Sequence, residues 1–292
     1  MLKSLRIATR KSPLALAQAR QVANALARQG VDSELVPIES EGDVNLSDSL
    51  ADAGGKGLFV KALEAALISG EADLAVHSLK DMPVRLPDGF ALAGVCPRAD
   101  ARDAWVADVD LDRLPPGSRI GTSSPRRAML IKRLHPQLEI APLRGNVGTR
   151  LAKLDGGEYA GIVLACAGLI RLGLGRRIRT ALPVESFIPA AGQGALALET
   201  LGGSTERPAV LAALNCPRTE RAVTAERSCM ETLGADCHSS VAAHALWRGD
   251  ELTLHACDGD ADHRQSAQCA RVQTLDEARD LGVRTAEALM TP

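Results

Sequence analysis

The sequence carries one carboxylate in a position suited to catalysis. Asp81 ends the polar stretch His77–Asp81, which follows a short apolar run. In open α/β sheets, ligands bind just beyond the carboxyl ends of strands. Among cations there, Asp81 would stay ionised and could stabilise a cationic intermediate or accept a hydrogen bond from an N–H group. A turn aspartate paired with Lys80 is the alternative, and spacing alone does not separate the two.

Basic residues gather where loops meet expected helices. Arg126 and Arg127 follow Ser124-Pro125, so they fall in a first helical turn, where cations oppose the helix dipole at a cost of a few tenths to ~1 kcal/mol. This placement indicates anions to bind, because guanidinium groups pair with carboxylate or phosphate through two parallel hydrogen bonds. A solvated basic face is the alternative. Nearby basic residues are Arg10, Lys11, Lys56, Lys61, Lys132, Arg133, Arg144, Arg150 and Lys153.

A cysteine in a predicted loop is the third candidate. Cys237 follows an expected helix and could be a nucleophile or an attachment point. A buried, inert thiol is the alternative. The seven cysteines contain no CxxC pair, which is typical of a reduced cytosolic protein rather than a disulfide framework. The C-terminal histidines and cysteines lack standard zinc spacing, so no metal site is predicted.

Two segments of the chain are similar to each other. Ile7–Pro13 and Ile120–Pro125 each combine an apolar strand, hydroxyl residues and a proline at a helix start. Ser12 and Ser124 are placed as N-caps. A strand that leads into a capped helix is an anion site, because free backbone N–H groups and the helix dipole point at the ligand. Two copies predict twin α/β domains that face a shared cleft.

Alternating strand and helix patterns predict an α/β fold, with a parallel sheet covered by helices on both faces. The first block is expected to contain strands 5–9, 33–38 and 72–77 and helices 13–29 and 58–68. The second is expected to contain strands 119–122, 138–142 and 160–165 and helices 125–134 and 149–154, before a glycine-rich turn and apolar run at 189–199. The last block reads as α+β, with helices 218–232 and 275–290 around strands 242–247, 252–257 and 267–272. The stretch 39–57 is expected to be a long functional loop.

The composition limits the function classes. Hydrophobic residues make up 46% of the 292 residues, enough for a sizeable core, while aromatic residues make up only 2%. Few aromatics argue against single-stranded nucleic-acid binding, which relies on stacking. A net charge of −2 gives no overall attraction to nucleic acid or anionic membranes. Neither a signal peptide nor a membrane span is expected.

Eight motifs together resemble the porphobilinogen deaminase family. They occur in the family's order and cover about residues 3–227 almost continuously, so the set is far more specific than any single motif. The motifs are 5–19, 54–67, 72–83, 121–130, 143–159, 167–174, 189–199 and 224–227.

The resemblance implies a fold and a setting. Two domains would be like type II periplasmic binding proteins, and a smaller α+β domain would carry the cysteine. Domain 1 would span 1–98 and 194–215 with a lid loop at 39–57, domain 2 would span 99–193, and domain 3 would span 216–292. A cytoplasmic monomer without nucleic-acid or membrane partners is implied as well.

The resemblance also implies residue roles. Asp81 would be the catalytic carboxylate, and Cys237 would hold a dipyrromethane cofactor through a thioether. The cofactor- and substrate-binding residues would be Arg10, Ser12, Gln18, Lys56, Phe59, Ser78, Lys80, Thr122, Ser123, Ser124, Arg126, Arg127, Arg144, Asn146, Arg150, Arg171 and Gln193.

The implied reaction joins four porphobilinogen molecules head to tail, with loss of ammonia, and releases hydroxymethylbilane by hydrolysis. This is a transferase reaction of tetrapyrrole and heme biosynthesis. Asp81 would stabilise positive charge and help move protons, while the arginines would orient the carboxylate-bearing chain.

The sequence departs from the family pattern near the cysteine and in the lid. Ala235-Asp236 precede Cys237 where the family usually has two glycines, and Ser240 stands in place of a proline. We expect Asp236 to raise the thiol pKa and slow alkylation. Glu41 and Asp52 stand where basic residues are common in relatives.

Two other functions are compatible with parts of the sequence. A non-catalytic receptor for a small anion would use the arginines but would need neither Asp81 nor Cys237. The second alternative is a related protein in which Cys237 carries no cofactor. Intact mass distinguishes both alternatives from the enzyme, because an enzyme that carries the cofactor is heavier than its sequence mass by two pyrrole units.

Overall fold

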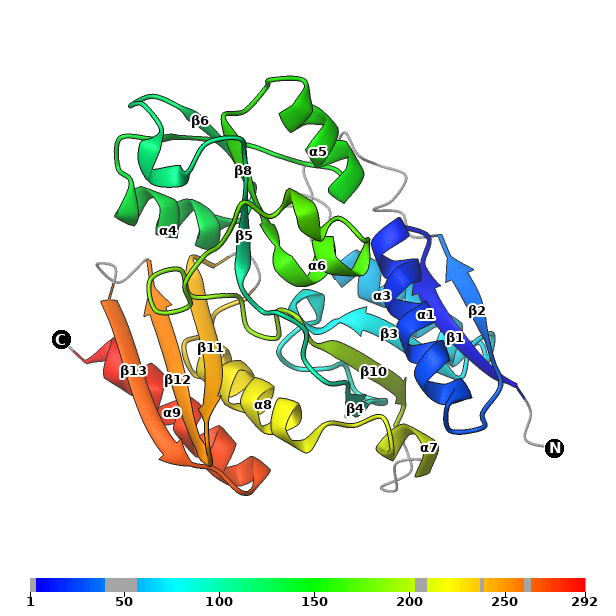
Figure 1. Ribbon diagram of the computed structural model, residues 1–292. Coiled ribbons are helices and arrows are strands. Elements are labelled where there is room, and N and C mark those ends of the chain that lie inside the picture. The colour runs from blue at the N-terminus through cyan, green and yellow to red at the C-terminus, as the bar shows by residue number, and fades with distance from the viewer. Residues whose placement is uncertain (1–3, 40–56, 203–208, 237–238, 260–263, 292) are drawn as a thin grey trace. The chain divides into compact units, whose positions relative to one another are not determined.

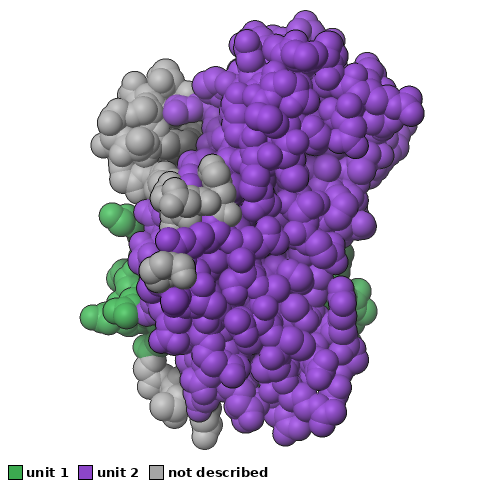
Figure 2. Space-filling view, turned by 90° about the vertical axis from the view of Figure 1, so that its left-hand side faces the viewer, with its two compact units in different colours: residues 1–98, 195–220 green, residues 99–194, 221–292 purple. Residues whose placement is uncertain are grey.

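The computed structural model describes residues 4–39, 57–202, 209–236, 239–259 and 264–291. The chain divides into two compact units (Figure 2). Unit 1 contains residues 1–98 and 195–220, and unit 2 contains residues 99–194 and 221–292.

Unit 1 is built on a five-stranded sheet of order β2-β1-β3-β10-β4 (Figure 1). β1, β2 and β3 are parallel, whereas β10 runs antiparallel to both of its neighbours. The elements are β1 (Leu5–Arg10), α1 (Pro13–Ala27), β2 (Ser33–Ile38), α3 (Gly57–Ile68), β3 (Leu74–Ser78), the 3-10 turn η1 (Leu79–Asp81), β4 (Phe90–Val95), β10 (Leu196–Leu201) and α7 (Ala209–Ala212).

Alternation along β1 and β3 directs side chains to both faces of this sheet. Ile7 and Leu74 pack with Val22 and Leu26 of α1. Ala8 packs on the other face in a separate cluster that includes Leu63 and Leu67 of α3. Burial on both faces explains why these strands are apolar with little polar alternation.

The first sheet of unit 2 has the same pattern of directions, in the order β7-β6-β8-β5-β9. β6, β7 and β8 are parallel, and β5 is antiparallel to both of its neighbours. The elements are β5 (Asp103–Val106), the 3-10 turn η2 (Leu111–Arg113), β6 (Arg119–Gly121), α4 (Pro125–Leu134), β7 (Glu139–Ala141), α5 (Val147–Asp155), β8 (Gly161–Ala165), α6 (Cys166–Arg171), the 3-10 turn η3 (Gly175–Arg177) and β9 (Thr180–Ala181).

The rest of unit 2 is a three-stranded antiparallel sheet with two long helices (Figure 1). Its elements are α8 (Pro217–Thr232), whose first turn belongs to unit 1, β11 (Val241–Arg248), β12 (Glu251–Asp258), β13 (Arg264–Arg271) and α9 (Leu275–Met290). Ala242 of β11 and Cys257 of β12 share one buried cluster with Leu130 of α4 and Phe187. The two sheets of unit 2 are therefore joined by a common core.

The predicted fold class is confirmed, with two similar α/β sheets and a separate α+β C-terminal part. The sheets were expected to be parallel, but each is mixed, because β10 and β5 each enter a sheet in the opposite direction. β4, β5, β9 and α6 were not expected from the sequence. β5 and β9 are short, at four and two residues, and such runs carry little periodicity.

Candidate active site

The carboxyl edge of the unit 1 sheet collects several of the predicted residues. Arg10 ends β1, and Ser78 ends the neighbouring parallel strand β3. Lys80 and Asp81 lie in η1, which follows β3 directly. Because parallel strands bring their carboxyl ends to one edge, the structure gathers these four residues there.

Local hydrogen bonds fix this edge. The Ser12 hydroxyl caps α1 by accepting a hydrogen bond from the Ala15 amide at 3.3 Å. Gln18 of α1 donates its side-chain amide to the Ser78 hydroxyl at 2.6 Å. The Leu79 amide donates to Ala195 O at 3.1 Å, which ties η1 to the start of β10. Asp81 is thus carried on a turn that is held by two different elements.

An unexpected group of ionisable side chains is buried in unit 1. Nε2 of His77 lies 2.8 Å from Oε2 of Glu199, and both side chains are nearly inaccessible to solvent. Glu64 of α3 is buried as well. Burial, followed by the charge of Glu199, raises the pKa of the Glu64 carboxyl. Glu199 was not identified from the sequence, although a carboxylate in the apolar run of β10 is unusual.

The carboxyl edge of the first sheet in unit 2 carries a second set of predicted residues. Thr122, Ser123 and Ser124 follow β6, Arg144 and Asn146 follow β7, and Arg171 ends α6, which follows β8. Arg150 lies in α5, and its Nε donates to Gly145 O at 2.7 Å. These residues converge on one edge because β6, β7 and β8 are parallel.

Hydroxyl and amide side chains shape this second edge. Ser124 caps α4 by accepting from the Arg127 amide at 3.4 Å, and Asn146 caps α5 by accepting from the Thr149 amide at 2.9 Å. The Ser123 hydroxyl accepts from the Leu143 amide at 2.9 Å and donates to Leu143 O at 3.1 Å. The predicted N-caps at Ser12 and Ser124 are confirmed.

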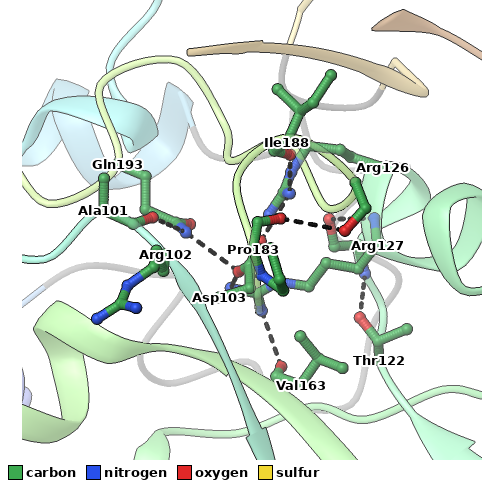
Figure 3. Close-up of polar contacts among 12 residues, drawn as sticks. Ala101, Arg102, Asp103, Thr122, Arg126, Arg127, Val163, Pro183, Ile188 and Gln193 are labelled. Atoms are coloured by element: carbon green, nitrogen blue, oxygen red, sulfur yellow. Dashed lines mark hydrogen bonds and ion pairs between the residues drawn. The ribbon is translucent and has the colours of Figure 1, made fainter. Parts of the chain in front are cut away.

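Arg126 and Arg127 already have an anionic partner inside unit 2 (Figure 3). Nη1 of Arg126 lies 2.7 Å from Oδ2 of Asp103, and Nη2 of Arg127 lies 2.7 Å from Oδ1. All three side chains are buried. An anion was expected for these arginines from the sequence, but Asp103, which lies in the short strand β5, was not identified as that anion.

The Asp103 carboxylate is ionised in spite of its burial. Burial opposes ionisation, but the nearby guanidinium groups of Arg126 and Arg127 outweigh it and hold the pKa of the Asp103 carboxyl below its usual range. Arg127 also donates to Val163 O at 2.9 Å. The pair of guanidinium groups is therefore rigidly placed beside the edge that carries Ser124.

Gln193 and Arg171 meet at the glycine-rich turn. The Gln193 side-chain amide donates to Ala101 O at 2.7 Å and to Oδ1 of Asp103 at 3.1 Å (Figure 3). Nη2 of Arg171 donates to Gly194 O at 2.8 Å. Gln193 is only 1% exposed, and its amide group takes part in the internal network around Asp103.

Three predicted residues cannot be placed in these two groups. Lys56 and Cys237 lie outside the described residues, as do Glu41 and Asp52 of the predicted lid. Phe59 lies in α3.

The described cysteines differ sharply in access. Cys96, Cys166, Cys229 and Cys257 are buried, Cys216 is half-buried, and Cys269 is exposed. Burial raises the pKa of the Cys166 and Cys229 thiols to about 12. Both are therefore protonated and poor nucleophiles at neutral pH.

The described part of the chain has neither a metal cluster nor a membrane-spanning helix. No cluster of three or more His, Cys, Asp or Glu side chains there could hold a metal ion. Among the same residues, no helix has the length and apolar character needed to cross a membrane.

Fold and site together define a protein with two related α/β sheets, each with polar and cationic residues at its carboxyl edge, and an α+β C-terminal part. The model of the porphobilinogen deaminase dipyromethane cofactor binding domain matches residues 5–207, and that of the porphobilinogen deaminase C-terminal domain matches residues 220–291. The chain belongs to the porphobilinogen deaminase family.

Curated relatives agree with this assignment. A porphobilinogen deaminase of Burkholderia ambifaria is 49% identical over 286 residues, which cover 96% of this chain and 87% of the relative. One from Burkholderia thailandensis is 52% identical over 255 residues, covering 86% and 78%. The chain is therefore a transferase with hydroxymethylbilane synthase activity in tetrapyrrole biosynthesis, and it uses a dipyrromethane cofactor.

Two solved structures match with lower sequence identity. The methionine binding protein MetQ is 14% identical, with a TM-score of 0.44, over 74% of this chain and 91% of that one. The periplasmic VFT2 domain of BvgS from Bordetella pertussis is 19% identical, with a TM-score of 0.42, over 73% and 85%.

Proposed function

We propose that Asp81 is the catalytic carboxylate of this hydroxymethylbilane synthase. The observation that carries the proposal is its place in η1, immediately beyond the carboxyl end of β3 and beside the strand that ends in Arg10. A carboxylate at such an edge can accept hydrogen bonds from pyrrole N–H groups and stabilise positive charge that develops on the substrate. It can also accept and return a proton during the condensation.

The cationic residues of both edges fit the cofactor and the substrate. Both molecules carry acetate and propionate groups, and guanidinium forks and hydroxyl groups are the donors that bind carboxylates best. When bound, the cofactor supplies the pyrrole to which new units are added. The residues proposed to hold these groups are Arg10, Ser12, Gln18, Lys56, Phe59, Ser78 and Lys80 in the first half, and Thr122, Ser123, Ser124, Arg126, Arg127, Arg144, Asn146, Arg150, Arg171 and Gln193 in the second.

Arg126 and Arg127 take a particular place in this proposal. Asp103 holds their side chains in fixed, buried positions, so they contribute a preorganised positive region at the N-terminus of α4. Preorganised charge stabilises an anionic ligand without the cost of ordering a mobile side chain.

The cofactor is proposed to be attached to Cys237 through a thioether. The burial of Cys229 and its raised thiol pKa support this choice over the nearest alternative. The C-terminal domain, proposed as residues 216–292, would then carry the cofactor. The other two proposed domains are domain 1 (1–98 and 194–215) and domain 2 (99–193).

The proposed setting of the enzyme follows from its composition and family. A cytoplasmic monomer that binds neither nucleic acid nor membranes suits a net charge of −2 and the scarcity of aromatic residues.

Intact mass spectrometry tests the covalent attachment. The purified enzyme should exceed its sequence mass by two pyrrole units, and denaturation should not remove this excess. In Cys237→Ser the excess should be absent. A Cys237→Ser protein that keeps the added mass would move the attachment to another cysteine.

A further inference from the structure

The 188–194 turn of unit 2 contacts two of the proposed anion-binding arginines directly. Ile188 O accepts a hydrogen bond from Nη1 of Arg126 at 2.6 Å. Gly194 O accepts from Nη2 of Arg171 at 2.8 Å. Between these points, Gln193 donates to Oδ1 of Asp103 at 3.1 Å, and Asp103 pairs with Arg126 and Arg127. A shift of this turn would therefore be transmitted to three guanidinium groups.

One buried carboxylate from another part of the chain holds the same turn. Oε2 of Glu226, in α8, accepts from the Gly192 amide at 2.7 Å. Its Oε1 accepts from the Ala245 amide of β11 at 2.8 Å and lies 3.2 Å from Nδ1 of His244. Glu226 is fully buried. A buried carboxylate is costly unless it is well hydrogen-bonded, so these contacts specify its position closely.

The backbone of the turn leaves little room for adjustment. Gly192 has φ 72° and Gly194 has φ 89°, a region that residues with a Cβ rarely adopt. A Cβ on Gly194 would lie 2.6 Å from Ala99 O. Because the chain is closely packed there, we expect a displacement at Gly192 to be passed along the turn rather than absorbed within it.

We propose that Glu226 is a positioning residue for substrate binding. It fastens the 188–194 turn to the C-terminal sheet and thereby sets the guanidinium groups of Arg126 and Arg171, with Arg127 set through Asp103. The inference rests on the proposed role of these arginines in binding the carboxylates of porphobilinogen. Glu226 itself contacts neither substrate nor cofactor in this scheme.

The variant Glu226→Gln tests the proposal in the cofactor-loaded enzyme. The Gly192 and Ala245 amides donate to different oxygens of the Glu226 carboxylate. Glutamine keeps the size of the side chain but replaces one of these oxygens with an NH2 group, which cannot accept, so one of the two amides loses its partner. Amide hydrogen exchange should become faster in peptides that contain residues 188–194 and 245. The KM for porphobilinogen should rise about tenfold while kcat stays within about threefold, as expected when binding rather than chemistry is impaired.

A matched control separates positioning from loss of stability. Thr285 is fully buried in α9, and its hydroxyl donates to Leu281 O at 2.7 Å. Thr285→Val should lower the melting temperature but leave the KM and the exchange of the 188–194 turn as in the wild type. If Glu226→Gln does not fold, Glu226→Asp, which keeps the charge on a shorter side chain, takes its place with the same expectations.

The outcomes distinguish this proposal from the proposed attachment chemistry. Unchanged exchange at 188–194 would show that Glu226 does not hold the turn. Faster exchange with an unchanged KM would show that the turn does not position the arginines. A wild-type protein without the added mass of the cofactor would count against the thioether at Cys237, and the exchange measurement would still decide whether Glu226 anchors the turn.

Discussion

Arg126 and Asp103 form a buried ion pair, with Nη1 of the arginine 2.7 Å from Oδ2 of the aspartate. Arg127 approaches the other carboxylate oxygen at the same distance. One internal carboxylate thus faces two guanidinium groups, which leaves net positive charge at the first turn of α4. This arrangement explains how a helix can begin with two arginines although its dipole opposes them.

Replacing Asp103 should be strongly destabilising. Asp103→Asn leaves two buried guanidinium groups without their carboxylate, and breaking a buried pair in this way costs about 3–5 kcal/mol. The free energy of unfolding from urea titration at pH 7 measures the loss. Asp110→Asn, which removes an exposed ion pair with Arg179, is the control and should cost much less. Equal losses in the two variants would contradict the assignment of Asp103 as a buried anchor.

The loss of stability caused by Asp103→Asn should become smaller at low pH. The pKa of Asp103 is lowered in the folded state, so its carboxylate stabilises the protein above its unfolded-state pKa of about 4. That contribution is lost as the pH falls from this value toward the folded-state pKa. The difference in unfolding free energy between wild type and Asp103→Asn should therefore narrow below about pH 4. A constant difference across this range would contradict the pKa direction.

Asp81→Asn should abolish turnover and preserve the fold. Removing a preorganised charge from a reaction centre typically lowers kcat by about a hundredfold or more. Product formation from porphobilinogen measures the rate, and the melting temperature should stay close to that of the wild type because asparagine matches the size of the half-buried Asp81 side chain. Retained turnover would remove Asp81 from the catalytic role.

Ser124 offers a way to separate a helix cap from a ligand contact. Ser124→Ala loses the cap of α4 and should cost about 1 kcal/mol of stability. Ser124→Asp retains an oxygen acceptor at the N-cap, so stability should be kept, but its charge should repel substrate carboxylates and raise the KM. Urea unfolding and steady-state kinetics on both variants provide the test. A Ser124→Asp enzyme with a wild-type KM would place Ser124 away from the bound carboxylates.

The cysteines should differ in both modification and attachment. Cys229 is buried with a thiol pKa of about 12, so Cys229→Ser should keep the cofactor mass. Iodoacetamide at pH 7.5 (about one unit below the ordinary thiol pKa) should label the exposed Cys269 and spare Cys166 and Cys229 in the folded enzyme. Peptide mapping after labelling identifies the modified cysteines. In the control variant Cys269→Ser, the label at position 269 should be absent. Loss of the cofactor mass in Cys229→Ser alone would overturn the attachment at Cys237.

Much of this protein is determined by local sequence. The serines before Pro13 and Pro125 specify two helix starts, and both act as N-caps in the structure. The limits of β2, α4 and α9 agree with the expected ranges at both ends. The motifs and their order likewise indicate the family. Helix starts, element limits and motifs each depend on residues that are close together in the chain, so they can be predicted from the sequence.

The tertiary structure alone decided which groups meet. Asp103 reaches Arg126 and Arg127, and Glu226 reaches Gly192, across long stretches of chain. The antiparallel directions of β5 and β10 in their sheets likewise depend on the tertiary structure. Buried charges find partners through the packing of whole elements, because the free energy of desolvation must be offset wherever the fold brings opposite charges together. The spacing of residues in the sequence does not predict which of these distant groups become partners.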